Sequence, residues 1–120
     1  TPHSAPIATK SPLHPFAKEG QGRLVHTASR AATAPAGAGF AYSVSKAGVL
    51  HLVQMAARDV AGTQIRVNAV SPAIIDTPAN RAAMPDADHD RWPTPADLGA
   101  TYLFLASPGA GVVNGAVLPV

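Results

Sequence analysis

Three residues in this chain have the types and spacing needed for proton transfer at a carbonyl group: Ser29, Tyr42 and Lys46. Tyr42 and Lys46 are four residues apart, so on a helix they lie on one face. There the ammonium can stabilise a phenolate, which is a usable acid or base near neutral pH. Ser29, at the end of an apolar run, can orient a carbonyl beside them. Together the three residues suggest carbonyl–alcohol redox chemistry.

The elements that must carry these side chains are a strand and a helix. Residues 23–28 predict a short buried strand that ends at Ser29, and residues 29–41, rich in Ala, Gly and Thr, predict a loop. Residues 42–61 predict a helix that ends before Gly62. Its apolar stripe comprises Val49, Leu50, Val53, Ala56, Ala57 and Val60, widened by Leu52 and Met55. The breadth of the stripe predicts that the helix also packs against a partner.

The rest of the chain continues the alternation of strands and helices. Residues 64–70 predict a second strand, and residues 73–93 predict a loop with a helical turn near 80–84. Thr94, followed by Pro95 and Asp97, predicts the start of a helix that runs to Ser107. Residues 115–120 predict a last strand. The order strand–helix–strand–helix–strand predicts an α/β fold with three parallel strands joined by helical crossovers.

The first twenty residues differ from the rest. Four prolines, Pro2, Pro6, Pro12 and Pro15, each remove a backbone donor and restrict the residue before them. We therefore predict that residues 1–20 form an irregular Pro-rich segment, or a degraded helix, and that residues 21–120 form the remaining domain.

Composition narrows the class of protein. The 120 residues suffice for one small domain, and a net charge of +2 without any Lys/Arg cluster argues against nucleic-acid binding. The chain has no cysteine, which excludes disulfides and is compatible with the cytoplasm. No apolar stretch is long enough to span a bilayer, and the five histidines lack metal-ligand spacing. We therefore expect a cytoplasmic protein with neither a metal site nor a membrane segment.

Four stretches of the sequence resemble a known family. They are Gly22–Ser29, Tyr42–Lys46, Ile65–Pro72 with its continuation through Pro78, and the closing segments 91–95, 104–107 and 115–120. In this arrangement they resemble the C-terminal half of a short-chain dehydrogenase/reductase (SDR). The resemblance implies a Rossmann-type doubly wound parallel sheet, represented by its C-terminal portion.

The resemblance also assigns catalytic roles. Tyr42 would be the general acid/base toward the substrate oxygen, and Ser29 would hold that oxygen. Lys46 would stabilise the tyrosinate and hydrogen-bond the nicotinamide ribose. The implied function is an NAD(P)-dependent oxidoreductase. It would transfer hydride between nicotinamide and a small carbonyl or alcohol substrate, as alcohol dehydrogenases and 3-oxoacyl-carrier-protein reductases do.

The cofactor implied by the resemblance is NAD or NADP. Tyr42 and Lys46 would contact it, together with Pro72, a backbone group near Ile75, and Thr77, which would contact the nicotinamide carboxamide. Trp92 would either line the substrate pocket or pack beside Pro93. The full-length form is expected to be a homo-oligomer, because the family dimerises through the helix that begins at Tyr42.

The sequence departs from the family pattern at three points. Ala73 follows Pro72 where the family has glycine, which is acceptable only if its φ is negative. The family's catalytic asparagine falls on Pro2, and the Gly-rich phosphate-binding turn is absent from this chain. These departures leave open an alternative: a catalytically inactive truncated fragment, or a dimerising interaction module.

Overall fold

A computed structural model of the chain describes residues 4–34 and 39–120, with side chains described from Pro12 onward. Its centre is a three-stranded sheet of β1 (Gln21–Thr27), β2 (Gln64–Ser71) and β3 (Val117–Pro119), in the order β1-β2-β3. Both pairings are parallel, with Gln21 opposite Gln64 at the start of the register. The predicted α/β fold with three parallel strands is confirmed.

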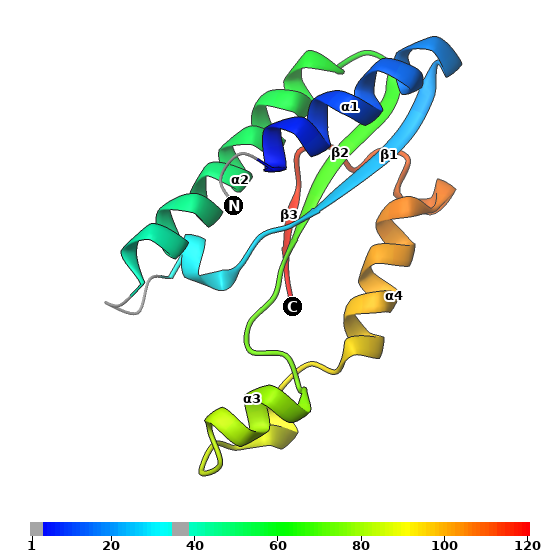
Figure 1. Ribbon diagram of the computed structural model, residues 1–120. Helices are drawn as coiled ribbons and strands as arrows, with labels where there is room; N and C mark the ends of the chain where they lie inside the picture. The colour runs from blue at the N-terminus through cyan, green and yellow to red at the C-terminus, as the bar shows by residue number, and fades with distance from the viewer. Residues whose placement is uncertain (1–3, 35–38) are drawn as a thin grey trace.

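Helices cover both faces of this sheet (Figure 1). α1 (Ser4–Glu19) and α2 (Phe40–Asp59) lie on one face, and α4 (Pro95–Ala106) lies on the other. Parallel neighbouring strands need such crossovers, because the end of one strand and the start of the next lie at opposite edges of the sheet. The arrangement is the layered, doubly wound architecture that the sequence predicted.

β2 is buried on both faces over most of its length, although polar residues alternate with apolar ones along it. Its residues Ile65, Val67 and Ala69 belong to a core cluster with Val53 and neighbouring residues of α2. Alternating with them, Val70 joins a second cluster with Leu105 of α4 and Ala110. Because successive side chains of a strand point to opposite faces of the sheet, β2 contributes residues to both core clusters.

The N-terminal segment is a helix that contains two prolines. Residues 1–20 were expected to be irregular, or a degraded helix; α1 is one helix from Ser4 to Glu19, with Pro12 and Pro15 inside it. A proline removes one backbone hydrogen bond but keeps a helical φ, and its cost of about 3 kcal/mol can be offset by packing. Leu13 and Phe16 supply that packing against the core cluster under α2. The Phe16 ring lies directly over Gly22, where any larger residue would collide with it.

The remaining predicted elements are present with small shifts. α2 begins two residues earlier than expected, after Gly39 in a left-handed conformation with φ 72°. α4 begins with the expected Thr94 cap, completed by Asp97 into a capping box. The helical turn predicted near residues 80–84 is α3 (Pro78–Ala83).

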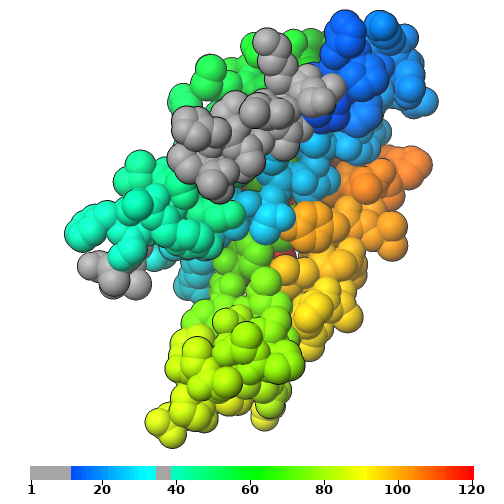
Figure 2. Space-filling model, in the orientation of Figure 1, coloured from blue at the N-terminus to red at the C-terminus, as the bar shows by residue number. Residues whose placement is uncertain are grey.

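Residues 74–93, which contain α3, lie beyond the ends of the strands (Figure 1) and project as a lobe in the space-filling view (Figure 2). Across residues 4–34 and 39–120, none of the helices combines the length and the apolar character needed to cross a bilayer.

Candidate active site

Ser29 is held at the carboxyl end of β1 by backbone hydrogen bonds on both sides. The Ala28 amide donates to the Val70 carbonyl at 2.8 Å, and the Arg30 amide donates to the Pro72 carbonyl at 3.0 Å. These bonds extend the β1–β2 pairing past the end of the strand and keep Ser29 extended, with φ −159° and ψ 148°. The Ser29 hydroxyl oxygen accepts a long bond of 3.3 Å from the Ala31 amide. Its hydrogen therefore remains available for a ligand oxygen.

Tyr42 and Lys46 lie in the first turns of α2. The Lys46 ammonium is 5.8 Å from the centroid of the Tyr42 ring, and it donates to the Thr27 carbonyl at 3.2 Å. The Tyr42 side chain is 53% exposed, and its hydroxyl bonds no other residue in the described part of the chain. The helix thus brings a cation beside a phenol that is free to exchange a proton.

Ser29 and Tyr42 open into one cleft, which we call the tyrosine cleft. It has a volume of about 690 Å³ and lies at the carboxyl ends of the strands, where open α/β sheets bind ligands. Its lining comprises Ser29, Arg30, Ala31, Ala34, Tyr42, Ser43, Pro72, Ala73, Ile74, Asp88, Arg91, Trp92 and Pro93. The structure therefore brings Ser29, Tyr42 and Pro72 together, whereas Lys46, Ile75 and Thr77 are outside this lining.

The loop after β2 forms one wall of the cleft and is fixed by backbone bonds. The Ala73 amide donates to the Val120 carbonyl at 2.7 Å, and the Asp76 amide donates to the Pro93 carbonyl at 2.9 Å. In the described ranges no residue other than glycine has a positive φ, so Ala73 meets the condition under which alanine replaces glycine here.

The cofactor residues predicted in this loop contact α3. The Thr77 hydroxyl oxygen accepts from the Asn80 amide at 3.2 Å and caps the helix, while the Asn80 side chain donates to the Ile75 carbonyl at 2.8 Å. Between them, Asp76 forms a bidentate pair with Arg81 at 2.5 and 2.8 Å. Hydrogen bonding from the guanidinium lowers the pKa of the Asp76 carboxyl. These hydrogen bonds hold the loop against α3.

The segment just before α4 also lines the cleft and carries the tryptophan. Trp92 and Pro93 both line the cleft, so the two interpretations of Trp92 are compatible. The His89 ring lies 4.6 Å from the Trp92 ring, and the His89 Nε2 atom is 2.7 Å from the Met84 carbonyl oxygen.

Sequence reasoning missed four side chains around this site. Arg30 and Arg91 line the tyrosine cleft, although the only signals were their positions next to Ser29 and Trp92. The hydroxyls of Thr27 and Tyr102 lie 2.6 Å apart, linking β1 to α4. No motif marked this pair, because 75 residues separate them.

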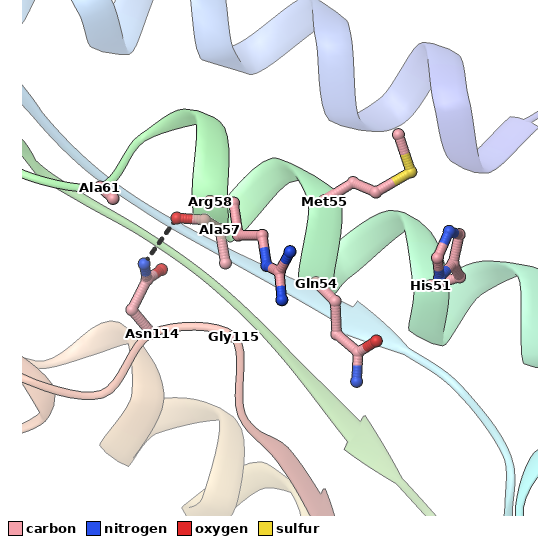
Figure 3. A pocket seen from close by; sticks show the side chains of 8 residues that line it. All are labelled: His51, Gln54, Met55, Ala57, Arg58, Ala61, Asn114 and Gly115. Carbon is pink, nitrogen blue, oxygen red and sulfur yellow. Dashed lines mark hydrogen bonds between the residues drawn. The ribbon is translucent and has the colours of Figure 1, made fainter.

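A second hollow, of about 540 Å³, lies against the C-terminal half of α2 (Figure 3). We call it the asparagine hollow, and its lining comprises His51, Gln54, Met55, Ala57, Arg58, Ala61, Asn114 and Gly115. The Asn114 side chain donates to the Ala57 carbonyl at 2.8 Å and accepts from the Val67 amide at 3.0 Å. Among the residues that the structure describes, no three His, Cys, Asp or Glu side chains gather as a metal site.

Comparison with known proteins agrees with this geometry. Residues 4–120 match the family model described as enoyl-(acyl carrier protein) reductase. Over 90 residues the chain is 42% identical to galactitol 2-dehydrogenase of Rhizobium johnstonii, covering 67% of this chain and 35% of that protein. It is 36% identical to 3-oxoacyl-(acyl-carrier-protein) reductase of Thermotoga maritima, covering 64% of this chain and 35% of that one. The chain thus spans about a third of these two relatives.

Solved structures give the same result. A short-chain type dehydrogenase/reductase from Mycobacterium ulcerans superposes with a TM-score of 0.78 at 30% identity, covering 86% of this chain and 41% of that one. A putative NAD(P)-dependent gluconate 5-dehydrogenase from Beutenbergia cavernae, with bound NADP, has a TM-score of 0.77 at 32% identity, covering 87% of this chain and 46% of that one. The sheet, the Ser29–Tyr42–Lys46 arrangement and these matches together show that the chain belongs to the short-chain dehydrogenase/reductase family.

Proposed function

We propose that the protein to which this chain belongs is an NAD(P)-dependent oxidoreductase, which transfers hydride between a nicotinamide and a small carbonyl or alcohol substrate. One observation carries the proposal. The Tyr42 side chain lines a cleft that it shares with Ser29, its hydroxyl bonds no other residue within 4–34 and 39–120, and the Lys46 ammonium lies 5.8 Å from its ring. The reported relatives, named dehydrogenases or reductases, support it, and they do not favour the alternative of an inactive interaction module.

In the direction of reduction, each side chain has a distinct task. The Ser29 hydroxyl donates a hydrogen bond to the substrate carbonyl oxygen and fixes its position. Tyr42 gives its proton to that oxygen as negative charge develops on it. The Lys46 ammonium stabilises the resulting tyrosinate through its positive charge. Oxidation of the alcohol reverses these steps.

The residues present fit the nicotinamide end of NAD or NADP. Lys46 has three N–H donors and uses one on the Thr27 carbonyl, so two remain for ribose hydroxyls. Pro72, Ile75 and Thr77 follow β2 on the same loop and would hold the nicotinamide ring. When bound, the cofactor supplies or accepts the hydride.

Two further features of the protein belong to the same proposal. The exposed Val44 and Met55 side chains on α2 support a homo-oligomer formed through this helix. We also propose that the enzyme works in the cytoplasm, in keeping with the absence of cysteine in the chain.

The test removes the hydroxyl group of Tyr42. In the oxidoreductase that contains this chain, Tyr42→Phe should lower kcat for carbonyl reduction by about 10²–10⁴-fold, the usual contribution of general acid/base catalysis. The rate is followed through the absorbance of the reduced nicotinamide. Tyr102→Phe is the matched control, because its hydroxyl binds Thr27 and it does not line the cleft. It should retain kcat within about tenfold.

Equal losses in both variants would overturn the assignment of Tyr42, as would full activity in Tyr42→Phe. Binding of reduced nicotinamide, measured by its fluorescence, separates the two steps. It should persist in Tyr42→Phe, because the ribose contacts of Lys46 remain.

A further inference from the structure

The charges around the tyrosine cleft are unequal. Arg30 borders it beside Ser29, and Arg91 borders it beside Trp92. Asp88 is the one acidic residue in the lining. With two fixed cations and one anion, the cleft presents a positive potential to a ligand that enters it.

Neither arginine is neutralised by the protein in the described ranges. There the only side-chain ion pair joins Asp76 to Arg81, outside the lining of the cleft. Asp88 is within ion-pairing distance of neither Arg30 nor Arg91. Both guanidinium groups therefore keep all their side-chain donors for a ligand or for solvent.

The surroundings favour a carboxylate over other ligands for these groups. A guanidinium presents a planar fork of donors that matches the two oxygens of a carboxylate. Ile74, Trp92 and Pro93 add apolar surface to the walls, which reduces the screening of a charge bound between them. Arg30 and Arg91 are both exposed, so a carboxylate can reach them from solvent.

We propose that the substrate is a small oxo-acid or hydroxy-acid, whose carboxylate binds Arg91 and Arg30 while Ser29 and Tyr42 contact its carbonyl or hydroxyl oxygen. This inference rests on the proposed function and adds the substrate class. In reduction, hydride from the nicotinamide forms a C–H bond at the carbonyl carbon. The C=O π bond breaks toward oxygen, which takes its proton from Tyr42. The nicotinamide is oxidised by two electrons, and the oxo-acid becomes a hydroxy-acid.

The first test compares two substrates that differ in one charge. The probes are 4-oxopentanoate and its methyl ester, used with the oxidoreductase that contains this chain. The acid should have a kcat/KM at least about tenfold higher than the ester. Arg91→Gln should reduce kcat/KM for the acid by about 10–100-fold, the range expected for a lost charge-assisted hydrogen bond. The ester should change by less than about twofold, because it offers no charge to lose.

Arg30→Gln should also reduce kcat/KM for the acid. Arg58→Gln removes an exposed arginine from the asparagine hollow and serves as the matched control. Arg58→Gln should leave kcat/KM unchanged for both the acid and the ester. The KM of the nicotinamide cofactor is measured in all variants, and a rise confined to the cofactor would assign these arginines to cofactor binding and overturn the proposal.

The second test needs no turnover. Trp92 lines the cleft, so its fluorescence responds to a ligand bound there, and the difference between the wild-type oxidoreductase and its Trp92→Phe variant isolates that emission. In the absence of cofactor, 4-oxopentanoate should change the emission and the methyl ester should not. Added salt should weaken the response, because the arginines are exposed and screened. Arg91→Gln should abolish it.

The two readouts separate failure of this inference from failure of the proposed function. Binding of the acid at Trp92 without turnover of either probe would contradict the oxidoreductase and keep the carboxylate site. Turnover of the ester equal to that of the acid, in wild type and in Arg91→Gln, would keep the oxidoreductase and overturn the carboxylate site. Neither binding nor turnover would contradict both.

Discussion

The tyrosine cleft and the asparagine hollow have similar volumes, about 690 and 540 Å³, but they are built differently. The cleft collects side chains from the end of β1, the start of α2, the loop after β2 and the segment before α4. The hollow is formed by α2 and one turn before β3 (Figure 3). In the cleft, backbone hydrogen bonds join the end of β1 to the loop after β2 and join that loop to the segment before α4, while the Lys46 ammonium of α2 donates to the Thr27 carbonyl.

The polar groups of the tyrosine cleft and the asparagine hollow also differ in their hydrogen bonding. In the cleft the Tyr42 hydroxyl remains free, and the Ser29 hydroxyl keeps its hydrogen. In the hollow the Asn114 amide is consumed by the fold, because it binds Ala57 in the last turns of α2 and Val67 in β2. The comparison teaches that volume does not identify a site.

The largest effect expected from this comparison concerns Asn114. Replacing it with alanine leaves the buried Val67 amide without its acceptor and removes the bond to the Ala57 carbonyl. We expect the free energy of unfolding to fall by about 2 kcal/mol, as for a buried donor left without a partner. Urea unfolding measures this loss, and cleft binding reported by Trp92 should be unchanged in the folded protein.

Gln54→Ala is the control for this variant, because Gln54 lines the same hollow and forms no hydrogen bond in the described structure. It should change stability by less than about 0.5 kcal/mol. A large loss of stability in Gln54→Ala, or no loss in Asn114→Ala, would contradict the structural role assigned to Asn114 in the asparagine hollow.

The fold could be predicted from the sequence because its signals are local. The alternation of apolar and polar residues in β2 has the period of a strand, and the apolar stripe of α2 has the period of a helix. The Thr94 cap marks the start of α4 within one residue. Ser29, Tyr42 and Pro72 could be placed together because carboxyl ends of parallel strands meet at one edge of the sheet.

The remainder depends on contacts between distant segments. Arg91 reaches the cleft because the Pro93 carbonyl is tied to Asp76, a bond with no sequence signature. The two internal prolines of α1 predicted an irregular segment, and only the packing of Leu13 and Phe16 explains the helix. Pro2, where the family's asparagine falls, lies outside the described residues, so that expectation stays a prediction.

The next prediction compares two threonine caps at the borders of the lobe. Thr77 caps α3 and Thr94 caps α4, and each hydroxyl oxygen accepts from the amide three residues ahead at 3.2 Å. Replacing either with alanine should cost about 1 kcal/mol of stability, measured by urea unfolding. In the oxidoreductase that contains this chain, Thr77→Ala alone should also raise the KM for the nicotinamide cofactor, because Thr77 is proposed to contact the carboxamide.

Thr77→Ser keeps the cap and the hydroxyl, so it should restore both quantities. If Thr77→Ala and Thr94→Ala raise the cofactor KM equally, the effect comes from loosening of the lobe. Thr77 would then be a helix cap and nothing more.

The smallest effect concerns the Asp76–Arg81 pair in the loop beside the cleft. The pKa of Asp76 is lowered from its ordinary value of 3.8, chiefly by hydrogen bonds from Arg81. A carboxyl with a lowered folded-state pKa contributes stability that is present above its unfolded pKa. That contribution is lost as pH falls through the folded pKa. Because the Arg81 side chain is 48% exposed and that of Asp76 is 20% exposed, solvent screens the pair and the loss should be slight.

Urea unfolding from neutral pH to below 3.8 measures this contribution in the wild type and in Asp76→Asn. The variant should be slightly less stable at neutral pH and should converge with the wild type in acid. Asp86→Asn is the control, because Asp86 forms no ion pair within the described residues and should follow the wild-type curve throughout. If the cleft and the core around the asparagine hollow unfold separately, protonation of Asp76 in acid should affect the cleft first. The Trp92 emission should then change at a higher pH than the far-ultraviolet circular dichroism. Simultaneous changes would mean that the cleft and the core unfold as one unit.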